Sequence, residues 1–411
     1  MRLNLQLGDT GRVLLSLYGP AVIMSLGQGM VIPTIPTLAS SFDVSAGLAA
    51  QLVTAGILGR VLSLLPAGQL LDVVGRKPVL VGGAVLVTLA SVLTAIAPVF
   101  PLLLIAQFLA GAGQNIWSMA RELVAVDVVR PEQRGRMMSG FHGMSSVGTA
   151  VGPVFGGIVT QAFGFRAVFW VYALLGLVVL LISVRIRETA RVKPERPTTR
   201  RLLSIGRLRE IAPEWRSTYV VLTFNTFVAM MRGALIPSLV PLYVGLQLGH
   251  TPTEVGTLFG IYGAVNVLMI APTGVLLDKL GRKSVVMPSA FLATGVFLLF
   301  PFATEMLPLA ILLGITGIAT GLALGSMATY TYDIIPEHAR ARLQTLRRLI
   351  GDVGALLGPL MGGMIADAAA PSAAFWAFVP LQLVAALAIT FLAKESLPYV
   401  RSRSHKVAAP G

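Results

Sequence analysis

The chain has 411 residues, of which 55% are hydrophobic and only 12% are charged, whereas soluble proteins carry about 25% charged residues. This composition excludes an ordinary soluble protein and predicts an integral membrane protein. The absence of cysteine excludes disulfides, thiol catalysis and cysteine-based metal sites.

Apolar segments of about 20 residues recur along the chain, and each is long enough to cross a hydrocarbon core about 30 Å thick. Residues 1–30 are interpreted as the first span and not as a signal peptide, because no small-residue cleavage site follows their apolar stretch. We predict six spans in residues 1–187, a charged cytoplasmic connector in 188–217, six more spans in 218–396 and a cytoplasmic tail in 397–411. The predicted fold class is an all-α membrane protein with twelve transmembrane helices.

The net charge of +14 raises the question of a nucleic-acid partner, and the positions of the basic residues answer it. Basic residues follow every second span, as at Arg76 and Lys77, and the connector region adds ten from Arg185 to Arg216, whereas the opposite side receives only Arg166. Such an excess of lysine and arginine is typical of cytoplasmic loops. Both termini are therefore predicted to be cytoplasmic, and the expected partner is the lipid bilayer and not nucleic acid.

A ten-residue phrase occurs twice in the chain. GQLLDVVGRK at residues 68–77 returns as GVLLDKLGRK at residues 274–283, a shift of 206 positions. The same shift superposes further pairs, which are Asp127 on Asp333, Gly148 on Gly354, Phe169 on Phe375 and Pro66 on Pro272. An internal duplication of this kind predicts two membrane halves of like topology.

The repeated phrase resembles the signature between spans two and three of the major facilitator superfamily, and its second copy resembles the weaker signature between spans eight and nine. GQGMVIPTIP at residues 27–36 and GTAVGPVFGG at residues 148–157 are similar to motifs of the drug/proton antiporter branches. The resemblance implies the major facilitator fold, alternating access, a central cavity lined by spans one, four, seven and ten, and secondary export. One departure is Gln107, which stands in span four where the family often has an arginine.

Polar side chains inside predicted spans are expensive in a membrane, at roughly 2.5 to 3.5 kcal/mol for a charged group at the centre, so they are functional candidates. Span four carries a polar stripe at helical spacing that runs from Gln107 to Arg121. The candidate cavity residues are Ser25, Gln28, Arg60, Gln107, Gln114, Asn115, Ser118, Asn225 and Arg232. Two arginines near mid-membrane, Arg60 and Arg232, would favour an anionic or zwitterionic substrate.

Two acidic residues are candidates for coupling transport to protons. Glu122 is the best embedded acid of the first half, and a desolvated carboxyl takes up and releases a proton near neutral pH. The alternative for Glu122 is a pair with an arginine near the cytoplasmic mouth. Asp352 lies four residues after Arg348, and its alternative role is that of a helix-start or gating residue in span eleven.

The repeated charged phrase is interpreted as a latch at the cytoplasmic mouth. Opposite charges there would pair when the mouth is closed and separate when it opens. The residues of the first half are Asp72, Gly75, Arg76, Lys77, Asp127 and Arg134, and those of the second half are Asp278, Arg282, Asp333 and Arg340. The alternative is that these residues only cap helices and set the topology.

Spans five and eleven carry a glycine and proline motif. Small residues on one face allow close helix contact in lipid, and proline bends a helix because it removes a backbone hydrogen bond. The residues are Gly148, Gly152, Pro153, Gly156 and Gly157 in the first half and Gly354, Gly358, Pro359, Gly362 and Gly363 in the second. Plain packing and a coupling role are both compatible with this motif.

The favoured function is proton-coupled efflux of amphipathic drug-like molecules across a bacterial-type cytoplasmic membrane. The alternative transport function is a carrier of organic anions or anionic lipids that uses Arg60 and Arg232. A membrane enzyme lacks support because no nucleophile and base constellation is evident, and a sensor lacks an output domain. The histidines show no metal spacing and no phosphate-binding GxxxxGK[ST] loop occurs, so we expect neither a metal nor a cofactor. The expected state is a monomer, and the expected partners are protons and a small-molecule substrate.

Overall fold

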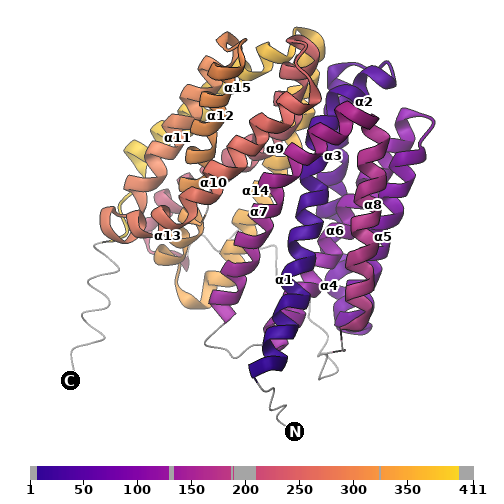
Figure 1. Ribbon diagram of the computed structural model, residues 1–411. Helices are drawn as coiled ribbons and strands as arrows, with labels where there is room; N and C mark the ends of the chain where they lie inside the picture. Colours follow the sequence, from indigo (N-terminus) through magenta and orange to yellow (C-terminus); the bar gives the residue numbers. More distant parts are fainter. Residues whose placement is uncertain (1–6, 129–133, 187, 189–209, 324, 398–411) are drawn as a thin grey trace. The chain divides into compact units, whose positions relative to one another are not determined.

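The computed structural model describes residues 7–128, 134–186, 188, 210–323 and 325–397, and the secondary structure of these residues is helical (Figure 1). The α-helices are α1 Leu7–Met30, α2 Ile35–Ser41, α3 Ala46–Leu62, α4 Leu64–Val73, α5 Arg76–Ile96, α6 Phe100–Val128, α7 Arg134–Phe163, α8 Phe165–Arg185, α9 Pro213–Pro241, α10 Pro252–Leu280, α11 Arg282–Leu299, α12 Met306–Ala323, α13 Ser326–Ile334, α14 Glu337–Ala368 and α15 Pro371–Leu392. Short 3-10 turns, η1 Ile32–Thr34 and η6 Phe300–Phe302, and a π-helical turn, η5 Leu242–Gln247, complete the order. The predicted all-α class is confirmed.

Eleven segments of the described chain are helical, long and apolar enough to cross a membrane. The predicted fourth span, α6, is not among them, although it has 29 residues. Its three amide side chains, Gln107, Gln114 and Asn115, lower its hydropathy. A helix of 29 residues is about 43 Å long, so α6 has the length of a span, and its polarity indicates that part of its surface faces protein or water.

Two of the predicted spans are interrupted. The second span divides into α3 and α4 at Ser63, close to Pro66, which has no N–H to donate to the Leu62 carbonyl and whose ring crowds that carbonyl. The tenth span divides into α12 and α13, and Gly325 between them has a φ of 81°, a left-handed conformation that favours glycine. Interrupted helices expose backbone groups that continuous helices satisfy internally.

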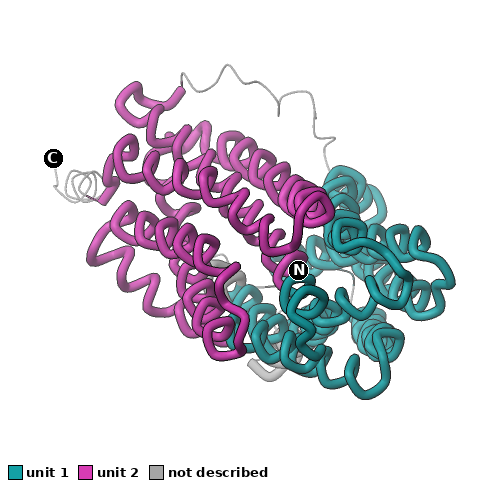
Figure 2. The backbone as a smooth tube through the Cα atoms, turned by 90° about the horizontal axis from the view of Figure 1, so that it is seen from above, with its two compact units in different colours: residues 1–197, 241–263 teal, residues 198–240, 264–411 magenta. Residues whose placement is uncertain are grey.

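Two compact units make up the chain (Figure 2). Unit 1 comprises residues 1–197 and 241–263, and unit 2 comprises residues 198–240 and 264–411. The boundaries of the two halves, the connector and the tail at residues 187, 217 and 396 were predicted from hydropathy, and they stay predictions. The segment 241–263 belongs to unit 1 by its contacts, among them the packing of η5 on α2.

Each unit has its own apolar core. In unit 1, α5 packs on α6 and α8, and α1 packs on α7 and α8, around buried Trp117 and Tyr172. In unit 2, α11 packs on α12 and α15, and a second cluster surrounds Tyr219 and Tyr330. The Tyr219 hydroxyl donates to the Leu343 carbonyl at 2.8 Å, which joins α9 to α14.

Glycines bring α7 against α1 and α14 against α9. A Cβ atom at Gly148 would lie 2.5 Å from the Val22 carbonyl oxygen, and one at Gly156 would lie 2.5 Å from Cα of Met30. In unit 2, a Cβ atom at Gly358 would lie 2.5 Å from the Met231 carbonyl oxygen. The predicted close helix contact is therefore present in both copies of the motif.

Most other members of the motif take part in the same contacts. A Cβ atom would meet α1 at Gly152, the first residues of α10 at Gly157, α9 at Gly354 and a leucine of α9 at Gly362. Gly363 is buried, and Pro153 and Pro359 lie inside α7 and α14, which continue through them.

Candidate functional site

The amide side chains of α6 connect this helix to three neighbours within unit 1. Gln107 Nε2 donates to Thr94 Oγ1 of α5 at 3.3 Å, and Gln114 Nε2 donates to Gln28 Oε1 of α1 at 2.5 Å. Asn115 Nδ2 donates to the Ser63 hydroxyl at 3.0 Å. The Asn115 bond ends at the break between α3 and α4, so the polar stripe of α6 contacts the second span where it is interrupted.

The remaining first-half cavity candidates differ in burial. Ser25 of α1 is 9% exposed and lies against the Gly148 contact, whereas Arg60 lies exposed in the last turn of α3. Ser118 donates to the Asn115 carbonyl at 3.0 Å. Ser25 is thus part of the packing between α1 and α7, whereas Gln28 and Gln114 form an accessible pair of amides.

Arg121 lies between two aromatic rings that sequence reasoning did not assign. Its guanidinium carbon lies 4.8 Å from the Trp117 ring centre and 4.7 Å from that of Phe141. Trp117 lies four residues earlier on the same helix face, a spacing that was visible in the sequence. Such cation–π contacts stabilise an arginine that is 6% exposed.

The neighbouring proton candidate, Glu122, is more accessible than Arg121. Its Oε1 atom lies 4.0 Å from Arg121 Nη2, and its side chain is 44% exposed. The structure thus brings Glu122 beside an arginine, as the alternative interpretation expected. This contact is at the limit of an ion pair. The prediction that Glu122 is the best embedded acid of the first half is wrong, because the Asp127 side chain is only 29% exposed.

The second-half candidates Asn225 and Arg232 lie on α9 and line a small pocket within unit 2. Asn225 Nδ2 donates to the Ala385 carbonyl of α15 at 2.9 Å, so this amide ties two helices together. Arg232 is 7% exposed. The pocket also includes Ser289 and Gln382, which sequence reasoning missed; Gln382 is a lone amide in the apolar last span, and that isolation was the available signal.

Asp352 is the more deeply buried of the two proton candidates, at 8% exposed. The structure does not place it at a helix start, because α14 already begins at Glu337. One turn or more earlier on α14, Arg347 donates to Thr226 Oγ1 at 2.8 Å and to Gln344 Oε1 at 3.0 Å. Gln344, Arg347 and Asp352 therefore place polar groups along more than two turns of α14.

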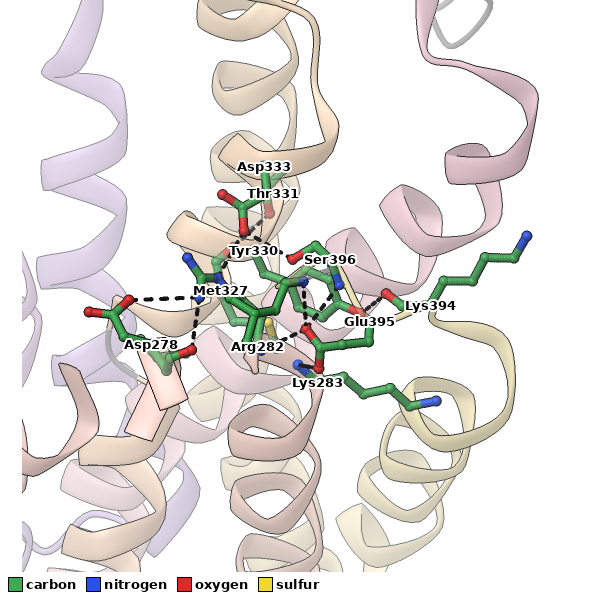
Figure 3. A network of polar contacts seen from close by, with 12 residues as sticks. Asp278, Arg282, Lys283, Met327, Tyr330, Thr331, Asp333, Lys394, Glu395 and Ser396 are labelled. Atoms are coloured by element: carbon green, nitrogen blue, oxygen red, sulfur yellow. Dashed lines mark hydrogen bonds and ion pairs between the residues drawn. The ribbon is translucent and has the colours of Figure 1, made fainter. Parts of the chain in front are cut away.

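A charged cluster in unit 2 joins α10, α11, α13 and the residues after α15 (Figure 3). Arg282 Nε donates to Asp333 Oδ2 at 2.9 Å, and Arg282 Nη1 lies 3.7 Å from Asp278 Oδ1 and donates to the Leu277 carbonyl at 2.8 Å. Ser396 Oγ donates to the same Asp333 oxygen at 2.9 Å. The Arg282 and Asp333 side chains are 9% and 13% exposed, so this pair lies largely out of solvent.

The corresponding pair of unit 1 is looser. Arg76 Nε lies 3.2 Å from Asp127 Oδ2, with side chains 23% and 29% exposed, but this N–H is not aimed at the oxygen as a hydrogen bond requires. Asp72 is exposed and forms no ion pair with the residues that the structure describes. The side chain of Arg134 lies outside the described residues. In unit 2, Arg340 Nη1 lies 3.8 Å from Glu337 Oε1.

In each half, a glutamate that follows the sixth span caps the helix that begins within the repeated phrase. Sequence reasoning missed both glutamates. The Glu188 carboxylate accepts from the backbone N–H groups of Arg76 at 3.1 Å and Lys77 at 3.0 Å. The Glu395 carboxylate accepts from those of Arg282 at 2.9 Å and Lys283 at 3.0 Å. Each acid therefore satisfies the free N–H groups at the start of α5 or α11 and complements the positive end of that helix.

The glycine of the phrase is required by this capping arrangement. Gly75 and Gly281 precede the two helices with φ angles of 101° and 104°, which glycine adopts readily. A Cβ atom at Gly75 would lie 2.9 Å from the Glu188 carboxylate oxygen. Position and conformation therefore both favour glycine at this turn.

Helices of membrane length in two units, with the same charged turn in both, define a helical membrane protein of duplicated construction. The chain belongs to the Major Facilitator Superfamily, whose family model matches residues 20–229 and again residues 221–408. The double match confirms the predicted duplication and fold.

Known relatives and solved structures agree with this assignment. The chain is 25% identical over 337 residues to the multidrug resistance protein MdtL of Escherichia coli O139:H28, covering 80% of this chain and 82% of that protein. It resembles the crystal structure of a bacterial homologue of the human lysosomal transporter Spinster, with a TM-score of 0.77, 16% identity and coverage of 93% and 96%. It also resembles a D-xylose–proton symporter, with a TM-score of 0.74, 15% identity and coverage of 93% and 98%.

Proposed function

We propose that this major facilitator transporter is a secondary exporter of amphipathic, drug-like small molecules. The observation that carries the proposal is its similarity over 80% of the chain to a multidrug resistance protein. The accessible amide pair Gln28 and Gln114 supports it, because neutral amides both donate and accept hydrogen bonds and so suit cargo of varied chemistry.

We further propose that export is driven by protons and that Glu122 carries the proton. The carboxyl is accessible and has Arg121 within 4.0 Å, so the competition between proton and arginine supplies two states. Asp352, which is buried in unit 2, is the second candidate. A carboxyl that alternates between these states couples proton flow to the conformational equilibrium.

We expect Glu122→Gln to abolish uphill export of a cationic dye in proteoliposomes that carry a pH gradient, while downhill dye exchange persists. Glutamine fixes the neutral form, so substrate binding remains and the proton linkage is lost. The matched control Glu305→Gln changes an exposed glutamate between η6 and α12 and should behave as wild type. Gradient-driven export at the wild-type rate in Glu122→Gln would show that Glu122 does not carry the proton. Asp352 would then be the candidate, and Asp352→Asn would test it in the same assay.

A second candidate function is the transport of organic anions, which the buried cation Arg232 favours. The same proteoliposomes distinguish the two functions when they are loaded with an anionic dye. Transport of the anionic dye alone would support the anion carrier and contradict drug efflux. Transport of the cationic dye alone would support drug efflux.

The described charged clusters at Arg76 and Arg282 are proposed to act as latches, each within its own unit. The supporting observation is that both arginines combine an ion pair to a following helix with a capped helix start. A conformational change that separates the ion pair leaves the cap in place, so the turn stays folded in both states.

We propose that the protein lies in a bacterial-type cytoplasmic membrane with both termini inside. We expect a single cysteine replacing Arg166 to react with a membrane-impermeant maleimide added to intact cells, and one replacing Arg200 to react only after lysis. Arg166 lies at the start of α8, and Arg200 lies in the connector outside the described residues. The absence of native cysteine makes either label unambiguous. Labelling of position 200 in intact cells would contradict the proposed topology.

A further inference from the structure

Two sides of the helix α7 have surroundings that follow from its sequence. Its small residues, such as Gly148 and Gly156, pack on α1. Its large apolar residues Val147, Val151 and Phe155 recur every four residues and are 41%, 38% and 52% exposed. A helix turns once in about 3.6 residues, so these three lie along one side, which suits contact with lipid.

The side of α7 opposite this apolar face is polar. His142, Ser146 and Thr149 follow one another at intervals of four and three residues, which places them on one side of the helix. Val151 lies about two and a half turns after His142, and therefore on the other side. His142 and Thr149 are exposed and Ser146 is half-buried. We call these three residues the α7 stripe; polar and ionisable residues within a span face water or protein and not lipid.

The α7 stripe runs between two packed contacts within unit 1. A Cβ atom at Gly29 of α1 would lie 3.2 Å from the Thr149 carbonyl oxygen. A Cβ atom at Gly263, in the part of α10 that belongs to unit 1, would lie 2.5 Å from Cα of Ala150. Gly29 directly follows Gln28, one of the two accessible amides. The stripe therefore ends where α7 meets the polar residues of α1.

The hydroxyl groups of the α7 stripe have already used their protons. Ser146 Oγ donates to the His142 carbonyl at 2.8 Å, and Thr149 Oγ1 donates to the Ser145 carbonyl at 3.0 Å. A hydroxyl has a single proton and two lone pairs, so both hydroxyls present acceptor positions outward. A neutral imidazole adds an acceptor nitrogen at His142. The stripe therefore suits a ligand that donates hydrogen bonds.

We propose that the α7 stripe is a cargo-binding surface that selects cations with an N–H group, such as protonated amines, over quaternary ammonium ions. The inference rests on the proposed export of amphipathic molecules and specifies the polar group of that cargo. A protonated amine donates a hydrogen bond that its charge strengthens. A quaternary ammonium ion has the same charge but no N–H, so it leaves the acceptors of His142 and Thr149 without a partner.

Binding of two matched dyes to the full-length protein in nanodiscs tests this selectivity. One is an anthracene with a dimethylaminomethyl group, which is protonated at neutral pH, and the other is its trimethylammonium analogue. Fluorescence titration gives the dissociation constant of each dye. We expect the wild type to bind the protonated amine at least about tenfold more tightly, because a site built to hydrogen-bond a group rejects the analogue that lacks it.

Substitutions in the stripe should remove this preference. The double variant His142→Leu with Thr149→Val loses two acceptors from exposed positions, so it should fold and bind both dyes equally. His142→Gln and Thr149→Ser each retain an acceptor and should keep the preference. Thr160→Val is the matched control on the same helix, because Thr160 is 3% exposed and donates to the Gly156 carbonyl at 2.6 Å; it should bind both dyes as the wild type does.

Equal binding of the two dyes by the wild type would overturn the proposal and leave the export of cations standing. A preference that persists in the double variant would overturn it too, because another part of the protein would then contact the N–H group. Failure of both dyes to bind the wild type would contradict the proposed export function and, with it, this inference.

Discussion

Gly156→Ala is expected to lower the free energy of unfolding by about 1–3 kcal/mol, the usual cost of overpacking a tight interior contact. The added methyl group would meet the main chain of Met30, with Cα only 2.5 Å away. Main-chain atoms cannot turn aside as a flexible side chain does, so α1 and α7 must separate along their contact. Denaturant titration of the purified protein in detergent micelles measures the loss.

The same helix provides the control. Gly143 lies inside α7 with nothing within 4 Å of its virtual Cβ atom, so Gly143→Ala should be neutral or should stabilise by about 0.5–1 kcal/mol through helix propensity. Equal effects at positions 143 and 156 would show that the glycines do not serve close packing. Gly354→Ala, in the second copy of the motif, should also destabilise the protein, because its methyl group would meet the Phe227 carbonyl.

Asp333→Asn is expected to destabilise the protein by about 3 kcal/mol, because it removes the close partner of a buried charge and leaves Arg282 paired only with the exposed Asp278 at 3.7 Å. Arg282 is 9% exposed at its side chain and holds Asp333 at 2.9 Å. Asparagine keeps the size of the side chain and removes its charge, so the loss reports the ion pair and not a cavity. Denaturant titration again provides the measurement.

Asp278→Asn acts on the same arginine and provides the contrast. Asp278 is 81% exposed at 3.7 Å from Arg282, and exposed ion pairs contribute only about 0–1 kcal/mol, so stability should stay near that of the wild type. If the cluster is a latch, Asp278→Asn should nevertheless increase alkylation of a single cysteine at Ser118 from the cytoplasmic side. Unchanged alkylation together with a stability loss in Asp333→Asn would reduce the cluster to a structural role.

Local sequence properties were sufficient to predict the fold. Hydropathy over about 20 residues predicted helices of membrane length, and the copy of residues 68–77 at 274–283 predicted the duplication, which the two family matches confirm. These features are readable because the membrane imposes length and apolarity on each helix separately. The glycines of α7, such as Gly148 and Gly156, were readable for the same reason, because small residues at regular spacing mark one helix face.

Polar contacts could be predicted from the sequence only where both residues recur at the shift of 206 positions. Asp127 and Asp333 were identified because they recur with the repeated phrase, whereas Glu188 and Glu395 were missed. The two glutamates are 207 positions apart, one more than the repeat, and they cap helices more than 100 residues earlier in the chain.

Hydropathy also predicted continuous second and tenth spans, and the structure breaks both. Proline alone does not decide such a break, since α10 continues through Pro272, the counterpart of Pro66. At Ser63 the break coincides with the hydrogen bond from Asn115, 52 residues away. At Gly325 it borders a pocket to which α9, α11 and α15 also contribute. Each helix could therefore be recognised from its own residues, but its interruptions and buried polar partners depend on distant segments that meet only when the bundle packs.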